Sequence, residues 1–319
     1  MDTVRAAIRP NTDAQYKVYI KKWMSFADSH GFSFKKPSIT QALLFLNRLH
    51  TSGASYSTVA SAKAALSHSF VLWQTDIFET NEHLVRKFMK GIWNKRPQLT
   101  NTSPVWNPVV VLNYIRCQDW PLSLIDLSRF TVTLIALATA ARTQTVTALR
   151  LDQLTVLENG SIACTIGSPL KQSRPGFHQG MILLSKYPGD TRICPVAYLN
   201  EYLKRTKLMR HVDTTSIFIG VQKPHHAVSA STIGRWIKET LKMAGIVNYS
   251  AHSTRSASTS SAKSAGVPIA TIMKNAGWTA ESTFAKHYDR PILHNTFQHT
   301  VLSSLPSLQG ATLADDHDG

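Results

Sequence analysis

The letters AHSTRSASTSSAKSAGVPIATIMKNAGWTAESTFAKHYDRP, residues 251–291, predict three consecutive short helices near the end of the chain. Gly266 is a good C-terminal stop for the first helix, and Pro268 suits the first turn of the second. Gly277 ends the second helix, and the third carries Tyr288 about two turns after it begins. The segment therefore places polar and aromatic side chains at the ends of short helices.

Four side chains of this segment could act together. His252 and Arg255 are three positions apart, so on a helix they share one face, and Trp278 and Tyr288 follow. Taken singly, each has an ordinary explanation: a capping histidine, a surface arginine, a core tryptophan and a half-buried tyrosine. Their combination within 37 residues is what indicates chemistry.

The charge of the chain indicates a polyanionic partner. The 319 residues suggest about two domains, and 35 Lys+Arg against 19 Asp+Glu give a formal charge of +16. Residues 1–100 hold 14 basic and 6 acidic residues, and residues 101–319 hold 21 and 13, so each part carries +8. A basic arm on a neutral body is thereby excluded, and nucleic acid or an acidic membrane surface remains.

Composition narrows the class of protein further. An apolar content of 43% fits a globular chain, and the most apolar run, Phe130–Ala141, is too short to span a bilayer. Cys117, Cys164 and Cys194 form no CxxC motif, which argues against a disulfide scaffold or zinc finger and favours a reducing compartment. We therefore expect a soluble intracellular protein, nuclear in a eukaryotic host, with DNA or RNA as its partner.

The first hundred residues predict a helical bundle, with helices from about Thr12 to Gly31, Ser38 to Gly53, Ser57 to Trp73 and Glu82 to Trp93. Its basic residues outnumber the carboxylates that could pair with them. They form either a solvated face or a clamp for a duplex backbone, and both interpretations stay open. The candidate DNA contacts here are Lys21, Lys22, Lys63, Arg86, Lys87 and Lys90.

The pattern breaks at residues 96–108, which hold three prolines and no periodicity, so we expect a linker. The domains are then a helical domain at 10–95, a second domain at 109–296, and a C-terminal segment at 297–319 with a disordered acidic tail. A short amphipathic helix could cover 291–304. The fold class is mainly α with a small antiparallel sheet.

Two upstream cations complete the candidate set. Arg142 follows the apolar helix expected at 122–141, and Lys171 lies in the loop 167–180 between β-compatible runs at 161–166 and 181–184, which predict a hairpin. Their ordinary explanations are a cation at a helix C-terminus and a solvated loop lysine. Arg174 is a local competitor for the lysine and a further candidate DNA contact.

These side chains match what metal-free cleavage of a DNA phosphodiester requires. A tyrosine hydroxyl can form a covalent phosphoester, and bidentate arginines suit the non-bridging oxygens. A proton acceptor for the phenol and a proton donor for the leaving oxygen are also needed. The pair His225-His226 lacks a third ligand, so we expect no metal site.

Arg142, Lys171, His252-x-x-Arg255, Trp278 and Tyr288 occur in the order of the tyrosine recombinase (phage-integrase-like) family, and the chain resembles that family over most of residues 104–296. The first domain fits the family's core-binding domain more loosely. The strings KQSRPG, HSTRSAS and STFAKHY look closest to recombinases of DIRS/Ngaro-type retrotransposons and Crypton-type elements.

The resemblance implies a site-specific recombinase or integrase that needs no metal, ATP or other cofactor. Tyr288 would attack DNA and form a 3′-phosphotyrosyl link, Lys171 would protonate the leaving oxygen, and His252 would accept a proton. Arg142, Arg255 and His252 would hold the phosphate, and Trp278 would donate its indole N–H and pack the site. The family's partners are double-stranded DNA and three further copies in a tetramer.

One position departs from the family. Many relatives carry Glu or Asp three positions after the first arginine, where this chain has Thr145. The missing carboxylate puts the bracing of the site in doubt.

Two alternatives to an active recombinase stay open. They are a domesticated DNA-binding protein that no longer cuts and a type IB topoisomerase-like enzyme.

Overall fold

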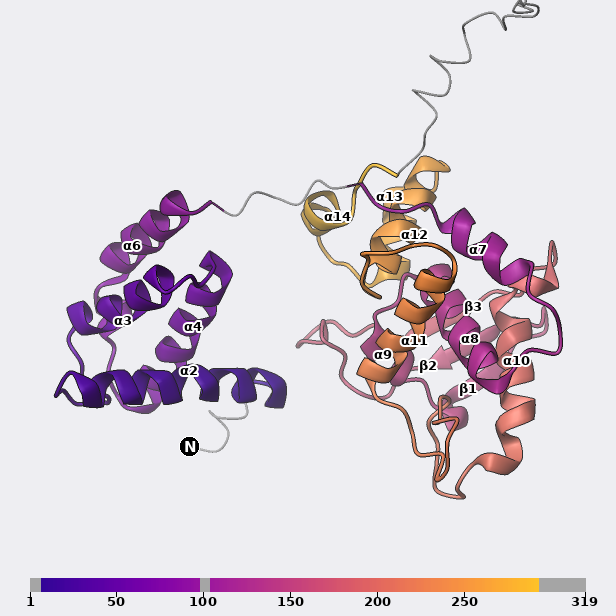
Figure 1. The fold of residues 1–319 in the computed structure, drawn as a ribbon, viewed down its shortest axis with the longest axis horizontal. Helices are drawn as coiled ribbons and strands as arrows, with labels where there is room; N and C mark the ends of the chain where they lie inside the picture. Colours follow the sequence, from indigo (N-terminus) through magenta and orange to yellow (C-terminus); the bar gives the residue numbers. More distant parts are fainter. Residues whose placement is uncertain (1–6, 98–103, 293–319) are drawn as a thin grey trace, which may run out of the picture. The chain divides into compact units, whose positions relative to one another are not determined.

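The computed structural model of the chain describes residues 7–97 and 104–292. The chain divides into two compact units, residues 1–100 and 101–319, each with its own hydrophobic core (Figure 1). The amphipathic helix expected at 291–304 and the acidic tail lie, from residue 293 on, outside the described residues. No described helix is long and apolar enough to cross a membrane.

The first unit is helical throughout its described elements. Ser38 and Gln41 form a capping box at the start of the second helix, and Ser55 caps the third, which explains why those helices begin where the sequence predicts. The short α5 was not expected. The elements are α2 (Pro10–Ser29), α3 (Ile39–Thr51), α4 (Tyr56–Leu72), α5 (Ile77–Thr80) and α6 (Glu82–Lys95).

An aromatic cluster holds the first unit together. Trp23 is fully buried, and its ring lies 5.3 Å from that of Phe45 and 6.0 Å from that of Phe70. Its indole N–H donates to the carbonyl of Phe34, so the polar edge of the ring is satisfied. Three helices are thereby joined by one side chain.

The second unit is also mainly helical. Its helices are α7 (Pro108–Arg116), α8 (Leu124–Thr139), α9 (Thr143–Thr147), α10 (Pro195–Thr206), α11 (Ala230–Met243), α12 (Ser253–Ser264), α13 (Ile269–Ala276) and α14 (Glu281–His287). Short 3-10 turns lie at Leu151–Gln153, Thr191–Ile193 and Lys207–Met209.

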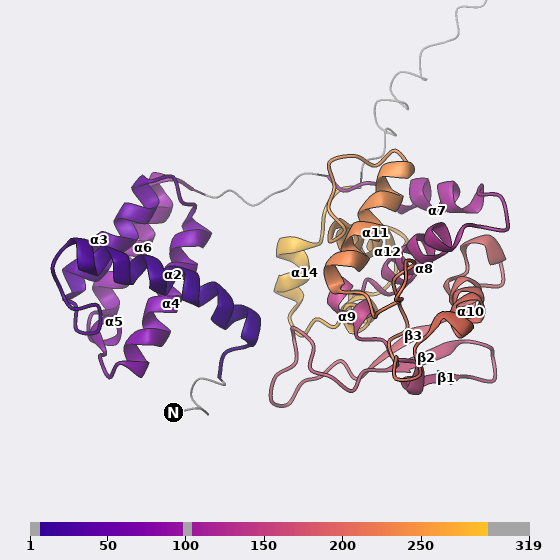
Figure 2. The same ribbon diagram turned by 60° about the horizontal axis from the view of Figure 1, so that its bottom comes forward.

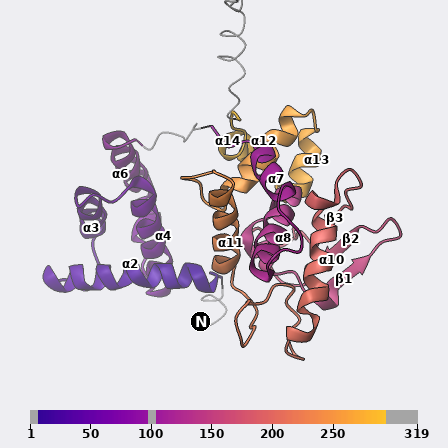
Figure 3. The same cartoon turned by 45° about the vertical axis from the view of Figure 1, so that its right-hand side comes forward.

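Helix α8 is the centre of the second unit. It packs against α7, α9, α10, α11, α12 and one strand of the sheet, and Figures 2 and 3 show it enclosed by them. The buried hydroxyls of Thr131 and Thr139 donate to the carbonyls of Leu127 and Ile135 one turn earlier. The threonines can therefore be buried within the helix without an unsatisfied hydroxyl.

A small antiparallel sheet of three strands completes the unit. The strands are β1 (Leu154–Val156), β2 (Ile162–Thr165) and β3 (Met181–Leu184), in the order β1-β2-β3. Ile162 pairs with Leu184 across the expected hairpin. The mainly α fold class with a small sheet is confirmed, whereas β1 was missed because its three residues are mostly exposed and show no alternation.

The end of the predicted linker is part of the second core. Val105 and Trp106 are 2% and 1% exposed, and Val105 pairs with Ile292 in a single parallel bridge. The indole N–H of Trp106 donates to the hydroxyl of Ser253 at 2.8 Å. The residues before α7 therefore tie down the start of α12.

Candidate active site

The six candidate residues come from five separate places in the second unit. Arg142 lies between α8 and α9, and the loop between β2 and β3 carries Lys171. His252 and Arg255 lie at the start of α12, Trp278 between α13 and α14, and Tyr288 at the end of α14.

Tyr288 and His252 are in direct contact. The hydroxyl of Tyr288 lies 3.1 Å from Nε2 of His252, and the two rings meet edge to face at 5.8 Å. His252 is the residue directly before α12. Because its backbone is nevertheless in the right-handed helical conformation, the three-residue spacing still directs His252 and Arg255 to the same tyrosine.

Arg255 is a buried cation held by two helix ends. Arg255 is only 2% exposed, and the two terminal nitrogens of its guanidinium donate to the carbonyls of Ala140 and Ala276. Ala140 follows α8 in the left-handed conformation, and Ala276 is the last residue of α13. Since helix C-termini carry unpaired carbonyls and partial negative charge, both ends stabilise the guanidinium.

The guanidinium of Arg255 also organises two aromatic rings. It lies 4.4 Å from the ring centre of Trp278 and 5.4 Å from that of Tyr288, and the two rings are 4.5 Å apart. Trp278 is 7% exposed. Its indole N–H and the Nε of Arg255 are buried and have no hydrogen-bond partner among the described residues.

Arg142 is positioned by a break between two helices. The apolar helix was expected to reach Ala141, but it ends at Thr139, and Arg142 is the extended residue that starts α9. Arg142 thus lies just beyond the C-terminus of α8 and directly before α9. The guanidinium donates to Oε1 of Gln172, at 3.0 Å.

Thr145 supplies no bracing charge. The residue is 2% exposed and lies inside α9, three positions after Arg142. Within residues 7–97 and 104–292, neither Arg142 nor Arg255 forms an ion pair with a carboxylate. The charges of these two arginines are thus not offset by an ion pair within the described structure.

Lys171 is exposed, and the structure does not bring it into direct contact with the other five residues. Its charge nevertheless reaches His252. Partial removal of the imidazole from water lowers the pKa of His252 below 6.5, and the nearby charges of Arg255, Arg142, Lys171 and Arg290 lower it further. The histidine is therefore neutral at pH 7.

Residues beyond the family motifs hold the tyrosine in place. The hydroxyl of Ser260 donates to the carbonyl of Tyr288 at 2.8 Å and accepts from the backbone N–H of Arg290 at 3.1 Å. Lys263 pairs with Asp289, one residue after the tyrosine. Sequence reasoning missed both contacts, although the serine- and threonine-rich composition of α12 was a signal, because such residues are poor helix formers and favour local polar contacts.

A chain of amide hydrogen bonds was also missed. Gln172 donates through Nε2 to Oε1 of Gln179 at 2.9 Å, and Gln179 donates to the carbonyl of Asn275 at 3.2 Å. Gly277 lies against this chain with φ of 64°, and a Cβ there would come within 2.4 Å of Oε1 of Gln179. We call Gln172 and Gln179 the amide relay. It links Arg142 to the end of α13.

The candidate DNA contacts of the first unit form two groups. Lys63, Arg86 and Lys90 line one hollow together with Trp93, and Lys21 and Lys22 line another on α2 and α3. Lys87 is exposed. Arg86 pairs with Glu82 at 2.6 Å, so one of the expected surplus charges is compensated.

Arg174 forms contacts with other residues of the second unit. Its guanidinium donates to the hydroxyl of Thr279 at 3.1 Å and lies 5.7 Å from the ring centre of Phe177. The residue is exposed, and the contact fixes the loop between β2 and β3 against the connection between α13 and α14.

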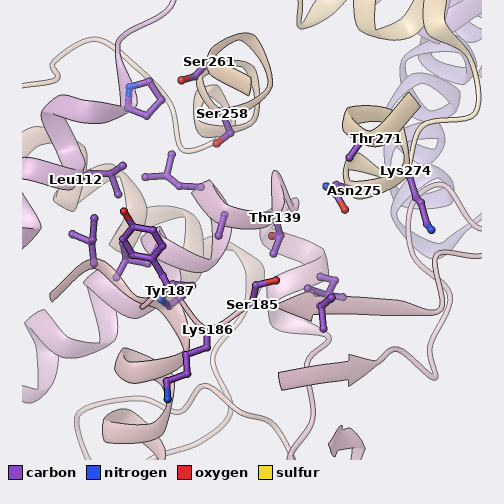
Figure 4. Close-up of a pocket in the computed structure, with 18 of the residues that line it drawn as sticks. Leu112, Thr139, Ser185, Lys186, Tyr187, Ser258, Ser261, Thr271, Lys274 and Asn275 are labelled. Atoms are coloured by element: carbon purple, nitrogen blue, oxygen red, sulfur yellow. The ribbon is translucent and has the colours of Figure 1, made fainter. Parts of the chain in front are cut away.

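A pocket of about 850 Å³ lies beside this region, between α7, α8, β3, α12 and α13 (Figure 4). Gln179 and Asn275 are among its lining residues, and none of the six candidate residues is. Among the described residues, no group of three His, Cys, Asp or Glu side chains is placed to hold a metal ion.

Comparison with known proteins gives the class to which this fold belongs. The DNA-bound pre-cleavage complex of the XerH site-specific recombinase aligns with a TM-score of 0.60 at 16% identity, over 92% of this chain and 79% of that one. A Tn1549 transposon integrase bound to circular-intermediate DNA gives 0.59 at 14% identity, over 94% of each chain. A λ integrase dimer on a core site gives 0.52 at 14%, over 88% of this chain and 72% of that one.

These likenesses show the fold of a tyrosine recombinase. Residues 117–293 match the phage integrase family, more than half of the chain, and the chain therefore belongs to that family. The comparison with curated proteins returned no match.

Replacement of Gly277 tests the fit of the amide relay. Gly277→Ala should lower the free energy of unfolding by about 1–2 kcal/mol for the left-handed backbone, plus about 1 kcal/mol because Gln179 must leave its partners. Gly266→Ala is the matched control, since Gly266 has φ of 82° and open space around it. Urea unfolding measures both, and equal losses would contradict the close contact.

Proposed function

We propose that the chain is an active site-specific DNA recombinase or integrase that cuts and rejoins strands through a 3′-phosphotyrosyl intermediate. The observation that carries this proposal is the contact between the Tyr288 hydroxyl and Nε2 of His252, with the buried Arg255 guanidinium over the tyrosine ring. A nucleophile thus contacts a proton acceptor at its hydroxyl and a fixed cation at its ring.

In the proposed reaction, the oxygen of Tyr288 attacks the phosphorus, and the bond to the 5′ oxygen breaks. Neutral His252, in the tautomer with its proton on Nδ1, takes the phenolic proton on Nε2. Lys171 gives a proton to the leaving 5′ oxygen. The exposed loop position of Lys171 is compatible with movement toward DNA. Rejoining to another strand reverses these steps.

The phosphate would be held by side chains that keep spare donors. A guanidinium has five N–H groups, and Arg255 gives two of them to backbone carbonyls. Arg142 gives one to Gln172. Two further donors, the indole N–H of Trp278 and the Nε of Arg255, are buried without a hydrogen-bond partner in the described structure. A phosphate oxygen would serve as the acceptor for each of them and remove a desolvation cost of about 1–3 kcal/mol per donor.

We propose further that residues 10–95 bind the DNA backbone as a clamp, joined through a linker to a catalytic domain that reaches residue 296. The hollow lined by Lys63, Arg86 and Lys90 supports this, because Lys63 and Lys90 adjoin the exposed ring of Trp93 there, while Arg86 is paired with Glu82. Arg174 would contact DNA beside the site.

The biological setting that we propose is integration or excision of a mobile element, with a tetramer assembled on DNA. The strings KQSRPG, HSTRSAS and STFAKHY support an origin in DIRS/Ngaro-type or Crypton-type elements, and in a eukaryotic host the protein would act in the nucleus. Similar folds occur in a transposon integrase and in a site-specific recombinase bound to its DNA substrate.

The role of Tyr288 is tested by covalent trapping on nicked suicide substrates built from the parent element's terminal repeats. Tyr288→Phe should abolish the SDS-resistant protein–DNA adduct and leave DNA binding within about twofold, since only one hydroxyl is lost. Tyr187→Phe makes the same chemical change at an exposed tyrosine that lies outside the site and should form adducts at the wild-type rate.

An adduct with Tyr288→Phe would refute the assignment of the nucleophile. A wild-type chain that binds DNA and never forms an adduct would instead be a DNA-binding protein that no longer cuts. Relaxation of supercoiled plasmid by monomers, without four-way junctions, would indicate a type IB topoisomerase-like enzyme.

The pH dependence of cleavage should report His252. Its lowered pKa keeps the imidazole neutral, so the single-turnover rate should be flat around pH 7 and fall only below pH 6.5, where the proton acceptor becomes protonated. In His252→Gln the slower remaining rate should lack this acid limb. An acid limb with its midpoint above 6.5 would be incompatible with the proposed acceptor.

Salt dependence of binding tests the clamp. With roughly 8–10 phosphates contacted, the slope of log affinity against log salt concentration should be about −7 to −9. Lys63→Ala and Lys90→Ala should each reduce its magnitude by about 1. Lys207→Ala removes an equal charge from an exposed position outside the clamp and should leave the slope unchanged. Equal effects of all three variants would refute a localised clamp.

A further inference from the structure

Arg142 has a neutral hydrogen-bond partner, Gln172. The position three residues later is Thr145, and the described residues place no carboxylate in an ion pair with Arg142. The guanidinium instead donates to the side-chain oxygen of Gln172, 30 positions further along the chain, at 3.0 Å. The bracing therefore comes from the loop between β2 and β3 rather than from α9.

The direction of the amide relay is set by chemistry. A guanidinium only donates, so the group of Gln172 that faces Arg142 must be its oxygen. The amide nitrogen of Gln172 then points to Oε1 of Gln179, whose own nitrogen meets the carbonyl of Asn275. Each amide donates once and accepts once, and reversal of either one would place two donors or two acceptors against each other.

The amide relay ends next to a carbonyl that binds the other arginine, Arg255. Asn275 accepts from Gln179, and Ala276, the following residue, accepts from Arg255. Gly277 comes next and leaves room for Gln179 and Gln172, whose atoms would lie 2.4 Å and 3.2 Å from a Cβ there. The last turn of α13 thus fixes both Arg142 and Arg255, through different contacts.

The neutral character of the relay matters for a phosphate site. A carboxylate beside Arg142 would hold the guanidinium but would also offset its charge, whereas an amide oxygen holds it and leaves the full charge available. Gln172 also follows Lys171 directly, so it could in principle act through the lysine instead. The hydrogen bond is made to Arg142, while Lys171 makes none within the described part of the chain.

We propose that Gln172 is a positioning residue that holds the guanidinium of Arg142 toward the scissile phosphate, supported from behind by Gln179. This inference rests on the proposed strand cleavage. It assigns to a loop glutamine the bracing that Thr145 cannot give, and it predicts that loss of Gln172 weakens stabilisation of the non-bridging oxygens.

The test separates an effect through Arg142 from one through Lys171. Single-turnover cleavage is measured on a nicked suicide substrate and on the same substrate with sulfur in place of the bridging 5′ oxygen. A thiolate leaves without protonation, so loss of a proton donor has little effect on the second substrate. The non-bridging oxygens are the same in both.

Gln172→Met, which keeps the length of the side chain without its polar atoms, should slow cleavage of both substrates by about tenfold to hundredfold. Gln172→Asn, too short to reach both partners, should behave similarly. Lys171→Met is the reference variant and should be slow only on the oxygen substrate. Gln179→Met, which leaves the contact between Gln172 and Arg142 possible, should cost less than Gln172→Met.

Two outcomes would overturn the inference while the proposed function stands. Either Gln172→Met and Gln172→Asn cleave both substrates within about twofold of the wild-type rate, or their defect disappears on the sulfur substrate, as for Lys171→Met. A wild-type chain that forms no covalent complex on either substrate overturns the proposed function itself. Thermal unfolding of each variant establishes that the rates compare folded proteins.

Discussion

The arrangement of the second unit depends on one buried cation. An isolated guanidinium in a protein core would cost several kcal/mol, and Arg255 meets no carboxylate in the described structure. It is held by the C-terminal carbonyls at Ala140 and Ala276. Because both helix ends need a donor and the guanidinium needs acceptors, α8, α12 and α13 are fixed together by the same contact that keeps the charge inside.

The aromatic side of that cation determines where the tyrosine lies. Trp278 and Tyr288 pack on the guanidinium and on each other, and His252 closes the hydroxyl end. The backbone on either side of the tyrosine carbonyl is then held by Ser260. A seven-residue helix, α14, has little stability of its own, so these contacts rather than helix propensity give the tyrosine a defined position.

Sequence reasoning could predict those features of residues 251–291 that depend on local helix geometry, whereas the set of six site residues came from the resemblance to a family. The helix stop at Gly277 and the shared face of His252 and Arg255 depend on neighbours within a few positions. The pairing of Arg142 with Gln172 spans 30 positions and depends on the path of a loop, which no periodicity encodes. The strand Leu154–Val156 could not be predicted for a related reason, because a short exposed strand forms through its pairing with β2 and shows no pattern of its own.

Gln179 belongs to two parts of the molecule at once. Its side chain accepts from Gln172, and it is also among the residues that line the 850 Å³ pocket between α8, α12 and α13 (Figure 4). Gln172 is hydrogen-bonded both to Gln179 and to the guanidinium of Arg142. A displacement of Gln179 in the wall of the pocket would therefore be transmitted to the guanidinium of Arg142 through two hydrogen bonds.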